Sequence, residues 1–259
     1  MTKRTLGKVW SPQLRNRRDV DVYLPPSYPT GRQRYPVVYM HDGQNLSDPR
    51  TAFAETWNLE ETLDRLARRG IEAIVIGIHN AGDARLQEYS PFPDRQHRGG
   101  EGDSYLAFLV DTLKPRIDRN FRTDSRHDAT VVFGSSMGGL ISLYGYFQYP
   151  SVFGRAGVMS PSIWFGQGRI LEYIADMKSP RGRLYLDVGT LEGVSTLGDA
   201  RRLGRLLVRK GFVRRRSAGR VGPRGEEKPA LRYVEDAGGR HNERDWAARL
   251  EAALEFLLA

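Results

Sequence analysis

Cysteine is absent from the 259 residues. This absence excludes disulfide scaffolds, thiolate nucleophiles, iron–sulfur clusters and cysteine zinc sites. Long apolar runs are missing too, because no run exceeds the six residues of Ala73 to Ile78, with the glycine counted, far short of the ~20 residues that a membrane helix needs. Residues 1–8 carry charge with no apolar segment behind them, so no secretory signal is predicted. We therefore expect a cytoplasmic protein without a membrane span.

Acidic residues are too few to balance the basic ones, and the formal net charge is +9 at pH 7. The imbalance is confined to residues 201–228, where eleven Lys or Arg stand against Glu226 and Glu227. The rest of the chain is neutral overall, so the body of the protein is not basic. We interpret 201–228 as a basic helix and loop segment exposed to solvent. Nucleic acid is not expected as a partner, although a polyanion bound by this segment is an alternative.

Apolar, β-branched runs alternate along the chain with longer segments of helical period. Short strands separated by helices predict a mostly parallel sheet with helices on both faces, which is an α/β fold. No repeat or flexible linker divides the chain, so we expect one domain over residues 1–259. Residues 91–102 and 217–229 are predicted loops, the first placed where it could cover a substrate. The predicted strands are Val20–Leu24, Pro36–His41, Ile71–Ile78, Ala129–Gly134, Arg155–Met159, Arg183–Val188 and Leu231–Val234, and the predicted helices are 59–67, 106–117, 137–149 and 242–258.

The most informative segment is Gly134-Ser-Ser-Met-Gly138, a G-x-S-x-G pattern between a predicted strand and a predicted helix. A sharp turn there lifts Ser136 clear of the sheet, and the flanking glycines remove Cβ atoms that would collide. The helix N-terminus also directs amide groups at developing negative charge. A plain glycine-rich turn would give the same five letters, but the strand before and the helix after favour Ser136 as a nucleophile.

A nucleophilic serine needs a base, and in this kind of fold the partners follow in the order serine, acid, histidine. Five histidines are present, and His241 alone follows Ser136. It stands in a glycine-containing loop between the last predicted strand and the last helix, where the base must be presented. None of the histidines lies at metal-ligand spacing from acidic residues, so neither a metal nor a cofactor is expected.

The acid should follow the strand before the one that leads to His241, and two carboxylates qualify. Asp187 lies at the end of the predicted strand 183–188, and Glu192 lies on the loop beyond it. A side chain inside a strand points at packed neighbours, whereas one on a loop can lean towards His241. We therefore favour Glu192 and keep Asp187 as the alternative acid.

Acyl transfer also requires donors for the oxyanion. The amide of Met137, next after the nucleophile, is one candidate. The second is the amide of Gln44, in the loop that follows the predicted strand 36–41, because Gly43 allows a tight backbone turn there. An ordinary turn would explain this loop equally well when it is considered alone.

The chain contains the segments YPVVYMHDGQNL from Tyr35, RLQEY from Arg85, GSSMGGL from Gly134, MSPS from Met159 and DVGTLEG from Asp187. Together these segments resemble the putative esterase family of α/β-hydrolases, which includes enterochelin-type, feruloyl and acetylxylan esterases, S-formylglutathione hydrolase and mycolyltransferases. The resemblance implies the α/β-hydrolase fold with Ser136 as nucleophile, His241 as base and Glu192 as acid. It also implies that the Gln44 and Met137 amides form the oxyanion hole.

These residues predict a serine esterase that acts on a small or medium-sized ester. His241 would take the Ser136 proton, Glu192 would stabilise the imidazolium, and water would release the acid from the acyl-enzyme. Two alternatives remain at this point. One is an acyltransferase with the same triad, and the other is a catalytically silent hydrolase fold that binds a polyanion through residues 201–228.

Overall fold

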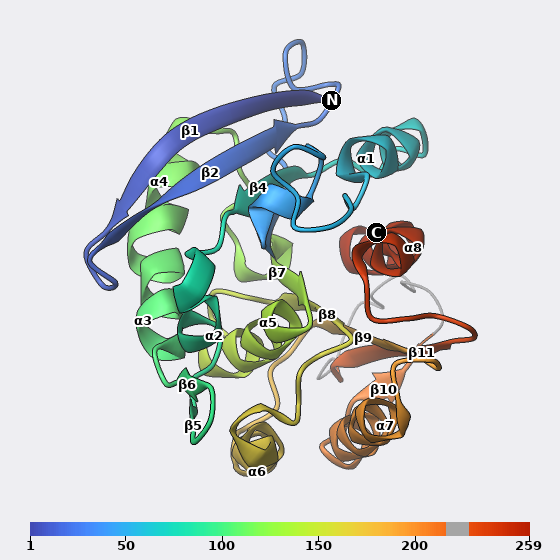
Figure 1. Cartoon of the computed structure of the whole chain (residues 1–259). Coiled ribbons are helices and arrows are strands. Elements are labelled where there is room, and N and C mark those ends of the chain that lie inside the picture. Colours follow the sequence, from blue (N-terminus) through green and yellow to red (C-terminus); the bar gives the residue numbers. More distant parts are fainter. Residues whose placement is uncertain (216–227) are drawn as a thin grey trace.

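The computed structural model describes residues 1–215 and 228–259 of the chain, and its central feature is one large twisted sheet (Figure 1). Within the described residues this sheet has nine strands in the order β1-β2-β4-β3-β7-β8-β9-β11-β10. The pairs β1/β2 and β2/β4 are antiparallel, and the remaining pairs are parallel. The strands are β1 Thr2–Ser11, β2 Asn16–Leu24, β3 Val37–His41, β4 Ile74–Ile78, β7 Thr130–Ser135, β8 Arg155–Met159, β9 Arg183–Gly189, β10 Val213–Arg214 and β11 Ala230–Asp236.

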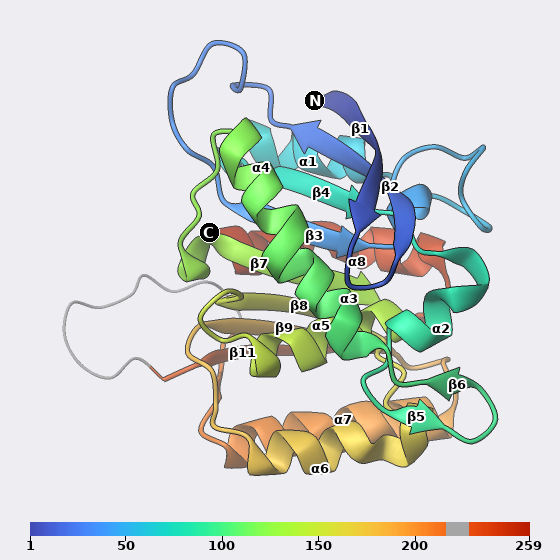
Figure 2. The same ribbon diagram turned by 90° about the vertical axis from the view of Figure 1, so that its left-hand side faces the viewer.

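Helices cover both faces of the sheet (Figure 2). Helices α3, α4, α5, α6 and α7 pack on one face, and α1 and α8 pack on the other. Their apolar side chains form a separate core on each side of the sheet, as expected for a mostly parallel sheet. The helices are α1 Leu59–Arg68, α2 Arg85–Glu88, α3 Gly102–Ala107, α4 Lys114–Asn120, α5 Met137–Gln148, α6 Arg169–Asp176, α7 Val194–Arg209 and α8 Glu243–Leu258.

The α/β fold, the mostly parallel sheet and all seven predicted strands are confirmed, with boundaries that differ by a few residues. The predicted helices are confirmed as α1, α5, α8 and a continuous helical run from Gly102 to Asn120. A π-helical stretch, η3 Phe108–Leu113, joins α3 to α4 within that run. Five-residue strands such as β3 and β4 are buried along their whole length, and for this reason their sequences show no alternation.

Strands β1 and β10 and helices α2 and α6 were not predicted from the sequence, and α7 begins at Val194, seven residues before the expected basic helix. Most side chains of β1 are exposed or half-buried, so its sequence lacks the apolar signal of a core strand. Helix α6 is short and buries only two of its side chains. The predicted loop 91–102 contains two strands of two residues each, β5 Pro93–Asp94 and β6 Arg98–Gly99. The predicted loop 217–229 lies almost entirely outside the described residues.

The register of the parallel strands aligns the carboxyl ends of four strands. Ser135 at the end of β7 pairs with Met159 at the end of β8, and Met159 pairs with Asp187 in β9. Gly189, the last residue of β9, pairs with Asp236, the last residue of β11. The loops that follow these strands therefore emerge side by side at one edge of the sheet, as in other open α/β folds that bind ligands there.

In the part of the chain that the structure describes, no helix combines the length and the apolar character needed to cross a membrane.

Candidate active site

Ser136 occupies a strained turn between β7 and α5. Its φ of 56° and ψ of −121° lie outside the regions that non-glycine residues prefer. The turn is tight because a Cβ atom on Gly134 would lie 2.7 Å from the backbone carbon of Gly138. The strand, sharp turn and helix that the G-x-S-x-G pattern predicts are thus present, and the serine lies at the N-terminus of α5.

The structure brings Ser136, His241 and Glu192 together in one chain of hydrogen bonds. His241 Nε2 lies 3.0 Å from Ser136 Oγ, and His241 Nδ1 lies 2.8 Å from Glu192 Oε2. These distances fall in the range that proton transfer requires. The Glu192 side chain is fully buried, whereas the His241 side chain is 39% exposed. The His241 ring is therefore open to a ligand while the Glu192 carboxylate is shielded from water.

The surroundings of Glu192 favour its ionised form. Burial raises the pKa of the Glu192 carboxyl, but hydrogen bonds from His241, from the Ser160 hydroxyl and from the Gly189 amide outweigh that effect and leave the pKa below its ordinary value. The Ser160 and Gly189 donors both contact Oε1, at 2.6 and 2.7 Å. Glu192 Oε2 is thereby left to His241.

Asp187, the alternative acid, lies elsewhere in the same network. Its side chain is fully buried and pairs with Arg249, whose Nε lies 3.0 Å from Asp187 Oδ2. Tyr185 donates a further hydrogen bond to the same oxygen at 3.1 Å. Burial raises the pKa of Asp187 to about 6, although Arg249 opposes the shift. Within the described part of the chain no hydrogen bond or ion pair joins Asp187 to His241, and the geometry therefore favours Glu192.

The loop that carries His241 is anchored on both sides. Asn242 caps α8, since its side chain accepts a hydrogen bond of 2.9 Å from the Asp245 amide. The ring of Trp246 meets the His241 ring edge-on, with 4.9 Å between the centroids. Leu191, beside Glu192, donates its amide to the Gly239 carbonyl at 2.9 Å. The loop that carries His241 is thus hydrogen-bonded to the loop that carries Glu192.

The two proposed oxyanion donors lie at the starts of short helical segments. Met137 is the first residue of α5, and Gln44 belongs to the 3₁₀ turn η1 Gly43–Asn45. Amides in the first turn of a helix have no acceptor within that helix, so they are available to a ligand. Gly43 is required here, because a Cβ atom at this position would lie 2.5 Å from the backbone of Gly77 in β4.

Asp42, just before that turn, is held by a clamp that the sequence analysis did not predict. The Nε and Nη2 atoms of Arg85 donate to its two carboxylate oxygens at 2.7 and 2.8 Å, and Asn80 Nδ2 donates at 2.7 Å. Burial raises the pKa of Asp42, but Arg85 and Asn80 lower it below its ordinary value overall. With a φ of 55°, Asp42 adopts a left-handed conformation that few residues tolerate.

Three residues of the RLQEY segment, Arg85, Glu88 and Tyr89, make contacts that support the Gln44 turn. Arg85 clamps Asp42, and the Tyr89 hydroxyl accepts a hydrogen bond from the Asp42 amide at 3.2 Å. Glu88 is buried and pairs with Arg18 of β2 at 2.8 Å. The segment therefore supports the Gln44 turn and joins it to the antiparallel part of the sheet. Spacing along the sequence could not show these contacts, because they connect three separate elements.

The remaining histidines have roles outside the triad. His41 is buried against the turn that carries Ser136, and its Nδ1 lies 2.8 Å from the Tyr105 hydroxyl. His79 contacts Asp21 at 3.1 Å, His97 contacts Asp94 at 2.9 Å, and His127 is exposed. Among the described residues, no three side chains of the metal-binding types come together as a metal site would require.

A cavity of about 750 Å³ opens directly onto Ser136 and His241. Its size matches that of pockets for small or medium-sized ligands. Its acidic residues are Asp42, Asp83 and Glu243 and its one basic residue is Arg85, which is already paired with Asp42. The other lining residues are polar or apolar: Gln44, Asn45, Thr51, Phe53, Ala54, Asn80, Gly82, Ser135, Asn242 and Trp246.

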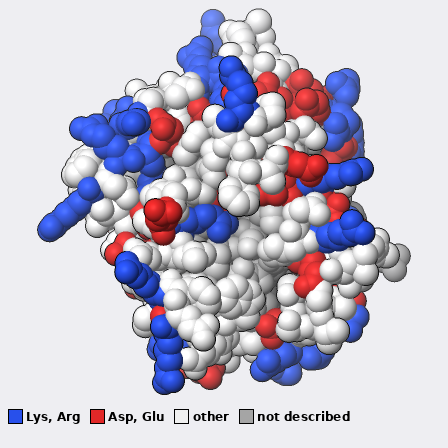
Figure 3. All heavy atoms as spheres, in the orientation of Figure 1, with Lys and Arg blue, Asp and Glu red and all other residues white. Residues whose placement is uncertain are grey.

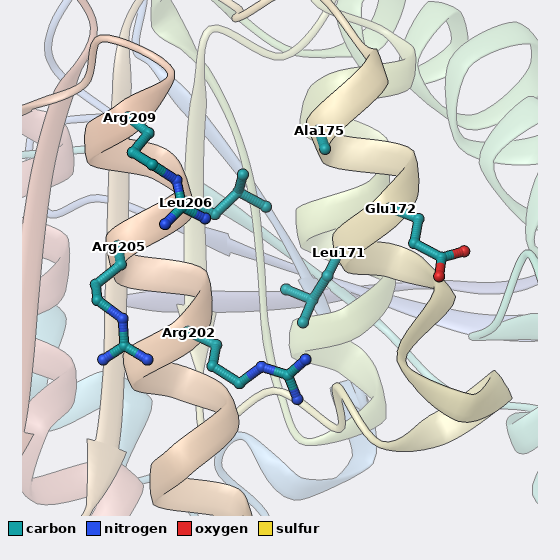
Figure 4. Close-up of a pocket in the computed structure, with 7 residues that line it drawn as sticks. All are labelled: Leu171, Glu172, Ala175, Arg202, Arg205, Leu206 and Arg209. Carbon is teal, nitrogen blue, oxygen red and sulfur yellow. The ribbon is translucent and has the colours of Figure 1, made fainter.

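The basic segment lines a different cavity, of about 400 Å³, between α6 and α7. Arg202, Arg205 and Arg209 line one side of it, and Figure 4 shows Glu172 pointing away from them. Other basic residues of the segment have structural partners, since Arg201 pairs with Glu235 at 2.6 Å and Lys210 donates to two backbone carbonyls near the end of α6. Acidic and basic side chains are also interspersed around the rim of the face in Figure 3. Part of the segment, residues 216–227, lies outside the described residues.

The fold is the α/β-hydrolase fold, and structures that share it include serine hydrolases. Residues 11–257 match the family described as "Putative esterase", and the chain belongs to that family. It is a serine esterase. The resemblance to this family is thereby confirmed.

Individual relatives agree with this assignment. The chain is 33% identical over 184 residues to the YbbA protein of Bacillus subtilis, a match that covers 69% of this chain and 70% of YbbA. It is 28% identical over 166 residues to the ferri-bacillibactin esterase BesA of Bacillus subtilis, covering 57% of this chain and 54% of BesA. The chain thus spans about half the length of BesA.

Solved structures show the same fold. The BES protein from Bacillus cereus has a TM-score of 0.76 at 22% identity, with 100% of this chain and 96% of that chain covered. The enterobactin esterase FES from Shigella flexneri, in the presence of enterobactin, has a TM-score of 0.74 at 21% identity. That match covers 99% of this chain and 59% of FES.

Proposed function

We propose that this protein hydrolyses carboxylic esters through a Ser136–His241–Glu192 triad within a single α/β-hydrolase domain. The observation that carries the proposal is the unbroken hydrogen-bond chain, 3.0 Å from Ser136 Oγ to His241 Nε2 and 2.8 Å from His241 Nδ1 to Glu192 Oε2. Ser136 and His241 line a cavity that is large enough for a small or medium-sized ester.

The reaction begins when Ser136 Oγ attacks the ester carbonyl and its proton passes to His241 Nε2. Glu192 stabilises the imidazolium that forms and fixes the ring orientation. The tetrahedral intermediate collapses, the bond to the alcohol breaks, and His241 gives its proton to the leaving oxygen. The product of this half-reaction is an acyl group on Ser136 Oγ and a free alcohol.

Water completes the cycle along the same path. His241 takes a proton from the water as its oxygen attacks the acyl-enzyme, then returns that proton to Ser136 Oγ as the acid leaves. The Met137 and Gln44 amides would donate to the oxyanion in both half-reactions, at the N-termini where amides lack helical acceptors.

The cavity suggests which substrates fit. Asp83 and Glu243 are carboxylates in its lining, while the Arg85 charge is compensated by Asp42. We infer a preference for neutral or cationic esters over anionic ones. The names of BesA and FES refer to siderophore esters, so esters of this class belong in a substrate panel beside aryl, sugar and thiol esters.

The test is a turnover screen over acyl length and leaving group, run with the wild type and Ser136→Ala. We expect hydrolysis of activated short-chain esters by the wild type and none above background by the variant. Unchanged turnover in Ser136→Ala would overturn the proposal. Product analysis with an added alcohol separates hydrolysis from acyl transfer, since a transferase would form the new ester in preference to the free acid.

A further inference from the structure

The segment Met159-Ser-Pro-Ser162 begins at the last residue of β8 and lies between the nucleophile and the acid. Its backbone joins the two neighbouring strand ends: the Ser136 amide donates to the Met159 carbonyl at 3.0 Å, and the Ser160 amide donates to the Asp187 carbonyl at 3.0 Å. The Ser162 amide donates to the Ser136 carbonyl, also at 3.0 Å. Through the main chain, residues 159–162 thus contact Ser136 and the strand β9, which leads to Glu192.

The neighbours of the Ser160 hydroxyl determine which hydrogen bonds it accepts and which one it donates. It lies 3.0 Å from Trp246 Nε1 and 3.1 Å from Arg249 Nη2, and both of those groups are donors with no acceptor capacity. Ser160 Oγ must therefore accept from both, and its own proton is left for Glu192 Oε1 at 2.6 Å. The residue is fully buried, so water cannot replace these contacts.

The backbone of Ser160 is also unusual, with a φ of 42° in the left-handed region. The amide contact with Asp187 and the close packing of α5 hold it there. A Cβ atom on Gly139 of α5 would lie 2.8 Å from the Met159 carbonyl oxygen and 3.2 Å from the Pro161 Cα. A strained residue held by its surroundings marks a position where geometry matters for function.

Ser162 acts at the other end of the triad. Its Oγ lies 3.1 Å from Ser136 Oγ, and the residue is buried. Ser136 has one hydroxyl proton, which must point at His241 Nε2 for the attack to begin. The Ser162 hydroxyl is then the donor to Ser136 Oγ, and this contact holds the nucleophile in the rotamer that reaches His241.

We propose that Ser160 and Ser162 are positioning residues of this esterase, Ser160 for the acid Glu192 and Ser162 for the nucleophile Ser136. The proposal rests on the proposed triad. Removing the Ser160 hydroxyl leaves Glu192 Oε1 with one donor fewer and frees the carboxylate to turn away from His241. Removing the Ser162 hydroxyl leaves Ser136 free to adopt rotamers that do not reach the base.

The experiment compares Ser160→Ala, Ser160→Gly, Ser162→Ala and Ser162→Thr with the wild type. Ser142→Ala is the matched control, because Ser142 is buried in α5 and no described group lies within hydrogen-bond distance of its Oγ. Ser162→Thr keeps a hydroxyl, and Ser160→Gly removes the hydroxyl while relieving the strained φ. Each variant is measured for kcat, KM, Tm and the low-field proton NMR signal of His241 Nδ1.

We expect Ser162→Ala to lose about tenfold in kcat with KM within about twofold, the size of one hydrogen bond to the reacting group. Ser162→Thr should recover most of that loss. Ser160→Ala and Ser160→Gly should lose kcat alike, by about tenfold or more, and should shift or broaden the His241 signal. Ser142→Ala should match the wild type in kcat and in the His241 signal.

The contrary results are distinct. If all four variants turn over like Ser142→Ala, the positioning roles are wrong. If Ser160→Gly keeps full kcat while Ser160→Ala loses it together with Tm, the residue serves backbone geometry alone and the role of its hydroxyl is wrong. Ser136→Ala is run in parallel: full turnover in that variant overturns the triad itself, whereas its inactivity beside normal Ser160 and Ser162 variants overturns the present proposal only.

Discussion

Arg249 Nε lies 3.0 Å from Asp187 Oδ2, and its Nη2 lies 3.1 Å from Ser160 Oγ, the hydroxyl that donates to Glu192. One guanidinium thus connects the two carboxylates that the sequence offers as the triad acid. Arg249 pairs with Asp187 and also lies 3.6 Å from Glu192 Oε1, but of the two carboxylates Glu192 is the one that contacts His241. This division of roles leads directly to the first prediction.

Glu192→Gln should lower kcat far more than Asp187→Asn. The amide keeps the size of the side chain but cannot stabilise the His241 cation, and loss of a triad acid costs about 10⁴ in a well-studied protease. Asp187→Asn should mainly lower Tm, because it removes the most deeply buried of the charges that pair with Arg249 and leaves that arginine with Asp236 at 2.9 Å and Glu192 at 3.6 Å. Turnover and thermal unfolding of both variants decide the matter. A large loss of kcat at unchanged Tm in Asp187→Asn, beside a near-normal Glu192→Gln, would identify Asp187 as the acid.

The clamp on Asp42 predicts an effect on the oxyanion turn. Arg85→Lys keeps the positive charge but loses the two-pronged contact with the carboxylate. We expect kcat to fall by about tenfold, a part of the 10²–10³ that loss of an oxyanion donor costs. Asn80→Ala, which removes only one of the three contacts, should cost less. Wild-type kcat in both variants would show that the clamp does not position Gln44.

The buried His41 predicts a pH dependence of stability. Burial lowers the pKa of His41 to about 3, against the opposing charge of Asp42, while an unfolded histidine titrates near ~6.5. Between these two pKa values His41 binds a proton in the unfolded chain but stays neutral in the folded protein. The free energy of unfolding therefore falls as the pH falls. From pH 7 to pH 5 this loss should be about 2 kcal/mol.

Urea unfolding at the two pH values checks this. His41→Gln should remove most of the His41 contribution to the difference, while His127→Gln, at an exposed position, should leave the difference unchanged. Equal losses of stability in the wild type and in His41→Gln would contradict the neutral buried state of His41.

The arginines between α6 and α7 should have no part in ester hydrolysis. Arg202, Arg205 and Arg209 line a cavity that shares no residue with the one at Ser136. Replacing all three by Gln should leave kcat/KM within about twofold, as for surface charges away from the reacting groups. A heparin titration at two salt concentrations tests the alternative. Tight binding that weakens steeply with salt and disappears in the variant would assign a polyanion site to this cavity.

The sequence predicts the framework of the site well, for a physical reason. Buried parallel strands are uniformly apolar and easily recognised, and their carboxyl ends must meet at one edge of the sheet. Ser136 and Glu192 follow such buried strands, and His241 follows β11, which is only partly buried but ends at the same edge. The order of the chain alone therefore brings the three residues near one another. The strand β1 escaped recognition because its exposed side chains carry no such signal.

The supporting contacts could not be predicted in this way. The Arg85–Asp42 pair spans 43 positions and the Ser160–Glu192 contact spans 32, and neither follows from local periodicity. The positive φ values of Asp42 and Ser160 are equally hidden, because non-glycine residues rarely adopt them. Chemistry-bearing residues are thus visible in the sequence, whereas the residues that orient them become visible only in the fold.

The most direct test of the triad is the site of covalent modification by a fluorophosphonate, located by mass spectrometry of peptides from the intact, folded protein. The triad predicts a single label on Ser136, which should be absent in Ser136→Ala. In His241→Ala the label should form at least about 100-fold more slowly, because no base removes the serine proton. A label on another residue, or labelling of Ser136 at the wild-type rate in His241→Ala, would contradict the triad.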